Sequence, residues 1–208
     1  MKVILEKVGT IISGKWHRNL LTPNWVQKNV FKTEKESIQV EFNVIDIEQP
    51  PRYVYENIRF IPSWDRVFIQ AIEYSDNVLN NIQEYAKELC EKLPETPILA
   101  IGYNFSYSES ISLIAEINKM FNYNDTSILS ELKLTINNSS LTRQIENKNG
   151  VLNFTISQKK DEVLFDFNFH YKINNNKEIT SVLDGRILKD KKTAEKILTN
   201  GYKLILGN

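Results

Sequence analysis

The chain has 208 residues and a mass of 24.3 kDa, with 26 basic and 26 acidic side chains and a formal net charge of zero. This balance excludes a strongly cationic nucleic-acid binder and a polyanionic mimic as overall types. The single cysteine, Cys90, excludes an internal disulfide framework and a cysteine-rich zinc site. The N-terminal residues form no long apolar run, so we expect neither a signal peptide nor a membrane helix, and a cytoplasmic location.

Strand patterns dominate the beginning of the chain. Alternating apolar and polar residues predict antiparallel strands over 36–47, 53–61 and 64–74. Pro50-Pro51 ends the first of them, because proline donates no ladder hydrogen bond. Pro62-Ser63 predicts a tight hairpin between the other two.

An amphipathic helix is predicted over 75–93, where apolar residues recur every three or four positions after the capping pair Ser75-Asp76. Cys90 lies beside the apolar stripe of this helix, so we expect a buried structural thiol and not a nucleophile. A strand over 98–107 and a short helix over 110–121 follow, and the polar stretch 122–127 is the best internal linker.

The second half predicts a four-stranded antiparallel meander, with strands around 132–136, 141–145, 152–156 and 163–173. Turns are predicted at 137–140, at Asn149-Gly150 and at 159–162. The last helix is predicted from about Asp190 through Tyr202. Residues 178–189 give no clear prediction.

Strands grouped together, with helices set apart from them, indicate an α+β fold. We expect two successive antiparallel meander-plus-helix units, whose sheets are covered on one face by amphipathic helices. The first unit spans 1–121 and includes the helix 75–93. The second spans 129–208, and we expect the two to pack as one compact domain.

Aromatic and arginine side chains gather in segments that lack clear periodicity. Large aromatics and arginine dominate interaction hot spots, because they bury much area at small entropic cost. The alternative is that the indoles fill the end of a core. The candidate interface residues are Trp16, His17, Arg18, Trp25, Trp64 and Arg66.

The net charge of zero hides an asymmetry. Residues 1–128 hold 13 basic and 17 acidic side chains, a difference of −4, whereas residues 129–208 hold 13 and 9, a difference of +4. A basic patch near the last helix suits an acidic protein surface or a phosphate, but a solvated helix face is the favoured interpretation. The patch consists of Arg186, Lys189, Lys191, Lys192 and Lys196.

Catalytic signatures are weak. The two histidines, His17 and His170, form no metal-ligand spacing, so we predict no metal site and no cofactor, with a carboxylate-only magnesium or calcium site left as an alternative. The sequence contains no nucleotide-binding loop and no hydrolase elbow. Isolated carboxylates such as Asp65, Asp166 and Glu162 leave a hydrolase acting on phosphate or sugar bonds as an alternative.

The sequence therefore favours a non-enzymatic interaction or assembly subunit that associates with itself, as a dimer, or with another protein. The richness in Ile, Asn and Lys is typical of AT-rich genomes and indicates a bacterial or phage system. The meander-then-helix order of residues 130–206 resembles that of SecB-type export chaperones, which implies a binder of peptides or partner proteins. A nucleic-acid-binding accessory protein is a further alternative, and we expect no membrane partner.

Overall fold

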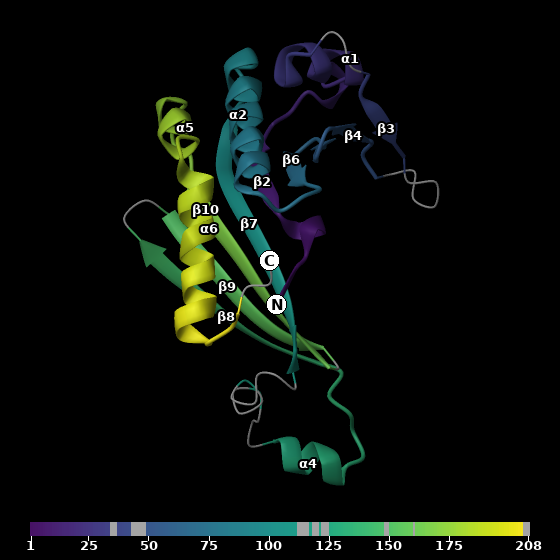
Figure 1. The fold of residues 1–208 in the computed structure, drawn as a ribbon, viewed down its shortest axis with the longest axis vertical. Helices are drawn as coiled ribbons and strands as arrows, with labels where there is room; N and C mark the ends of the chain where they lie inside the picture. Colours follow the sequence, from purple (N-terminus) through teal and green to yellow (C-terminus); the bar gives the residue numbers. More distant parts are fainter. Residues whose placement is uncertain are drawn as a thin grey trace.

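The chain forms an α+β fold, as predicted, with one antiparallel sheet of ten strands (Figure 1). The computed structural model describes residues 1–33, 37–42, 49–111, 117, 121, 125–147, 150–159 and 161–205. The sheet order is β3-β4-β5-β6-β2-β7-β10-β9-β8, and β1 pairs with β7 next to β2. The strands are β1 Lys2–Val3, β2 Gly9–Gly14, β3 Gln39–Glu41, β4 Arg52–Tyr55, β5 Ile58–Pro62, β6 Arg66–Ala71, β7 Ile98–Ser110, β8 Asn138–Asn147, β9 Gly150–Lys159 and β10 Glu162–Lys172.

The long helix α2 (Asp76–Lys92) packs on β2 and β6, and α6 (Arg186–Lys196) lies beside α2 and against β7. Both helices cover the same face of the sheet (Figure 1). The Ser75 hydroxyl caps α2 by accepting a hydrogen bond from the Val78 amide at 3.3 Å, as the sequence predicts. The shorter helical segments are η1 Leu5–Lys7, η2 Arg18–Leu20, α1 Pro23–Val26, η3 Gln27–Phe31, α4 Thr126–Glu131, α5 Lys177–Val182 and η5 Ile197–Gly201.

The core lies between the sheet and these helices. Alternate residues of β10 point into it, including Phe165, Phe167 and Phe169, all buried. The Phe167 ring stacks on Phe154 of β9 with centroids 4.4 Å apart, and it meets Tyr107 of β7 edge to face. The strongly alternating sequence of the second half is thus explained by one aromatic face that the helices cover.

The two predicted units share one sheet, because β7 of the first pairs along its length with β10 of the second. The expected meander arrangement is therefore matched only roughly. The predicted single strand 53–61 is wrong: it is a hairpin, β4 and β5, which turns at Glu56 with φ +48°. The Pro62-Ser63 hairpin is confirmed by the 2.8 Å bond from the Ser63 amide to the Arg66 carbonyl.

The predicted strand 132–136 and the turn 137–140 are also wrong. Residues 132–137 pair with no strand in the part of the chain that the structure describes, and β8 already begins at Asn138. β7 replaces the missing strand of the meander as the neighbour of β10. Within the described residues the predicted strand 36–47 appears as β3. Its residues 36 and 43–47 lie outside the described residues, as do most of the predicted helix 110–121 and Asn149 of the predicted turn.

Thr10 leaves a polar atom unsatisfied in this core. Its side chain is 0% exposed, and its hydroxyl has no hydrogen-bond partner among the described residues. We expect Thr10→Val to raise the free energy of unfolding by about 1 kcal/mol, because valine keeps the shape and removes the desolvated hydroxyl. Urea denaturation measures the change. Thr142→Val is the control, since the Thr142 hydroxyl shares a 3.0 Å hydrogen bond with Thr155, and a loss of stability in Thr10→Val would contradict the prediction.

Candidate functional site

The two tryptophan-containing segments singled out in the sequence meet in the structure. The Trp16 amide donates to the Trp64 carbonyl at 3.0 Å, and the Gly14 amide donates to the Asp65 carbonyl at 2.9 Å. The end of β2 and the turn before β6 therefore lie side by side. Trp64, at 58% exposed, is accessible there, and Arg66 is exposed beside it.

The six candidate residues of these segments do not form one exposed surface. Trp16 is only 3% exposed and its indole donates to the Ile12 carbonyl at 3.0 Å, so it belongs to the core and not to a free surface. Trp25 packs, half-buried, against the same core, where the Thr22 hydroxyl caps α1. His17 is exposed and Arg18 is half-buried.

The basic patch is divided by the way α6 sits on the sheet. On its inner side Asp190 accepts a hydrogen bond from the Tyr171 hydroxyl at 2.6 Å, and the Arg186 guanidinium lies over the Tyr171 ring, 5.1 Å from its centroid. Asp190 is 4% exposed, and burial raises its pKa to about 6 against the lowering effects of the Tyr171 hydrogen bond and of the nearby Arg186 and Lys189 charges. Arg186 is thus engaged within the fold.

A second polar cluster fixes the middle of α6 against α2. The Lys191 ammonium donates to the Asp76 carboxylate at 2.6 Å and lies 4.7 Å from the centroid of the Tyr74 ring. The Tyr74 hydroxyl lies 2.6 Å from that of Tyr107 and donates to Glu195 at 3.1 Å. Lys191 therefore holds the two helices together and is not available for a partner.

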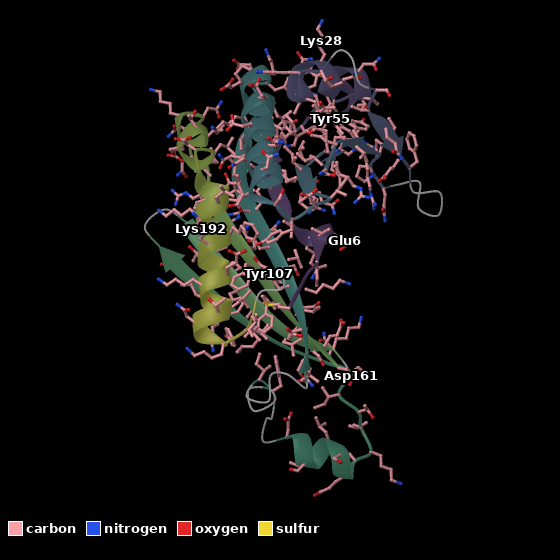
Figure 2. The ribbon with its side chains drawn as sticks, in the orientation of Figure 1. Glu6, Lys28, Tyr55, Tyr107, Asp161 and Lys192 are labelled. Carbon is pink, nitrogen blue, oxygen red and sulfur yellow. The ribbon has the colours of Figure 1, made fainter. Side chains whose placement is uncertain are left out.

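The remaining lysines of the patch lie on the outer side of α6. Lys189, Lys192 and Lys196 are exposed and recur at steps of three and four, so they follow one line along the helix. They border a shallow, open surface hollow of about 830 Å³ whose lining residues all lie on one helical run, between Gly185 and Gly201, and its apolar lining comes from Leu188 and Ile197. Figure 2 labels Lys192 on this helix. We call this surface the α6 groove.

The second candidate surface is the segment 125–137, which we call the arm. It contains α4 and the extended residues that lead into β8, and it lies apart from the sheet beyond the end of β7 (Figures 1 and 2). A left-handed residue, Lys133 with φ +58°, ends the helical turn. The arm carries four exposed aliphatic side chains: Ile128 at 55%, Leu132 at 63%, Leu134 at 57% and Ile136 at 46% exposed.

The face of the sheet opposite α2 and α6 carries polar side chains. Asn153 donates to Asn168 at 3.1 Å, and Asn168 donates to Asn104 at 2.6 Å, so a row of amides crosses β9, β10 and β7. Asp166 accepts from the Ser106 hydroxyl at 2.5 Å and forms an ion pair with Lys7 at 3.0 Å. The amide row and the partners of Asp166 fit a solvated sheet face held by its own hydrogen bonds.

Within the described residues, the candidate catalytic and metal-binding side chains do not gather at one place. The described residues contain no group of three or more His, Cys, Asp or Glu side chains able to hold a metal ion. Asp65 and Glu162 are exposed, and His170 is exposed on the same face as Asp166. Cys90 is buried, as predicted, and burial raises the pKa of its thiol to about 12, which suppresses the reactive thiolate at neutral pH.

Comparisons of the chain with protein families, with curated proteins and with solved structures give no match. None of the described helices is both long and apolar enough to cross a membrane. The arm and the α6 groove are the two candidate interaction surfaces of the described chain.

Sequence reasoning missed the arm. The alternation of Leu132, Leu134 and Ile136 is the signal of a half-buried strand, and it led to the prediction of a fourth meander strand. In the structure these three side chains are exposed to solvent, although they follow the alternating pattern of a half-buried strand. The sequence signal is the apolar stripe itself. Because the described chain leaves this stripe uncovered, it is typical of an interaction segment.

Proposed function

We propose that this protein is an interaction subunit that associates with a second copy of itself through the arm. The observation that carries the proposal is the uncovered apolar stripe of Ile128, Leu132, Leu134 and Ile136. Exposed apolar side chains gathered in one short segment are typical of a surface that a partner covers. The candidate reactive groups lie apart from one another, and the polar face of the sheet is held by its own hydrogen bonds. Both observations support a binding function over an enzymatic one.

The test compares two double variants of equal apolar loss. In Leu132→Glu with Leu134→Glu, two charges are placed in the arm, and we expect self-association measured by sedimentation velocity to weaken at least about tenfold, because each charge would have to be desolvated in the contact. The control is Leu20→Glu with Leu99→Glu, which alters two other exposed leucines, at 52% and 56%. Equal weakening by both variants would argue against the arm.

A second candidate function follows from the α6 groove, which has the apolar lining that a binder of unfolded polypeptide requires. This is the peptide-binding alternative that the element order suggested. Strong binding of an environment-sensitive apolar dye by the native protein, displaced by an unfolded polypeptide, is the result expected for this function. A native protein that leaves the dye free would exclude it.

A further inference from the structure

We infer that the arm of one copy docks into the α6 groove of the second copy, and that the second copy returns the same contact. This inference rests on the proposed self-association and assigns both of its surfaces. Two such contacts related by a two-fold axis give a closed dimer, the commonest form of soluble homo-oligomer. The two surfaces match in apolar character and in charge, and α6 is held in place by contacts within the fold.

The apolar match is between exposed aliphatic side chains and a lined groove. The arm presents Leu132 at the end of α4, and Leu134 and Ile136 at alternate positions of the residues that lead into β8. The α6 groove is an open hollow of about 830 Å³ along one helical run, and its apolar lining residues are Leu188 and Ile197. Inserting the aliphatic stripe there removes apolar surface from water on both partners.

The charges of the two surfaces are opposite. The arm carries two exposed carboxylates, Asp125 and Glu131, against one basic residue, Lys133. The groove is bordered by the exposed ammonium groups of Lys189, Lys192 and Lys196. Opposite potentials at the rim of an apolar contact speed encounter and fix the orientation of the partners.

The groove is held in place before a partner arrives. The bonds from Tyr171 to Asp190 and from Lys191 to Asp76 attach the inner side of α6 to the sheet and to α2. These bonds set the rotation of α6 about its axis, so that Lys189 and Lys192 face outward. A preformed surface lowers the entropic cost of docking.

The experiment reverses the charge of each surface separately. One variant is Asp125→Lys with Glu131→Lys in the arm, and the other is Lys189→Glu with Lys192→Glu in the groove. Each alone puts like charges together in both contacts of its homodimer, so we expect at least about tenfold weaker self-association for each. In an equimolar mixture both contacts join opposite charges, and we expect association to return to within about threefold of the unmodified protein.

Sedimentation velocity of the three chains and of the mixture separates the possible failures. An unmodified protein that stays monomeric would end the proposed self-association itself. If the unmodified protein associates but the groove variant associates equally well, the arm docks elsewhere and only the inference is overturned. A mixture that associates as weakly as either variant alone would also overturn the inference. All four substitutions lie at exposed positions, and circular dichroism of each variant verifies that the fold is kept.

Discussion

Replacing Gly9 by alanine is expected to lower the free energy of unfolding by at least about 3 kcal/mol, or to abolish folding. Gly9 has φ +149°, which side-chain-bearing residues rarely adopt. A Cβ added there would lie 2.1 Å from the Ile69 carbonyl oxygen and 2.9 Å from the Gln70 Cα. Both neighbours are backbone atoms of β6, so relief requires the β2–β6 ladder to open at the centre of the sheet.

The matched control is Gly201→Ala. A Cβ at Gly201, in the helical segment η5, would have no atom within 4 Å among the described surroundings. Alanine is the better helix former, so this variant is expected to be neutral or up to about 1 kcal/mol more stable. Urea denaturation compares the two variants, and a Gly9→Ala protein within about 1 kcal/mol of the control would contradict the strand pairing described for β2.

The second large effect concerns Asp190, on the inner side of α6. Its pKa is raised from the ordinary 3.8 to about 6 by burial. Between these values the folded protein holds a proton that the unfolded chain has released, so the free energy of unfolding falls as pH rises from 4 to 6. Above pH 6 the ionised Asp190 lowers the free energy of unfolding by on the order of 2 to 3 kcal/mol relative to its value near pH 4.

Asp190→Asn keeps an acceptor for the Tyr171 hydroxyl and removes the buried charge. We expect the variant to match the unmodified protein near pH 4 and to exceed its stability by on the order of 2 kcal/mol at pH 8. Asp65→Asn is the control, because it makes the same substitution at an exposed carboxylate. A variant that is less stable at pH 8 would mean that the attraction of Arg186 outweighs burial.

The elements with strict periodicity were predictable from the sequence. α2 and β10 each follow a single pattern over more than ten residues, and their burial matches it. The hairpin of β4 and β5 was missed because its turn, Glu56-Asn57, contains neither glycine nor proline. The continuity of the sheet through β7 and β10 was missed because pairing between distant strands leaves no local mark.

The candidate surfaces were predictable only in part. The lysines of the last helix were visible as a patch, but the separation of Lys191 from Lys192 depends on contacts with Asp76 and Glu195 that only the packed helices provide. Trp16 and Trp64 carry the same side chain. Only the fold determines that the Trp16 indole is buried and the Trp64 indole is exposed. The stripe of the arm was read as part of the sheet, since periodicity reports which face is apolar and not what covers it.

Sedimentation equilibrium of the unmodified protein, at concentrations rising through the micromolar range, measures the proposed self-association without any substitution. We expect a mass that climbs from the 24.3 kDa of one chain toward twice that value and stops there. A mass that stays at 24.3 kDa at every concentration would rule out the proposed self-association.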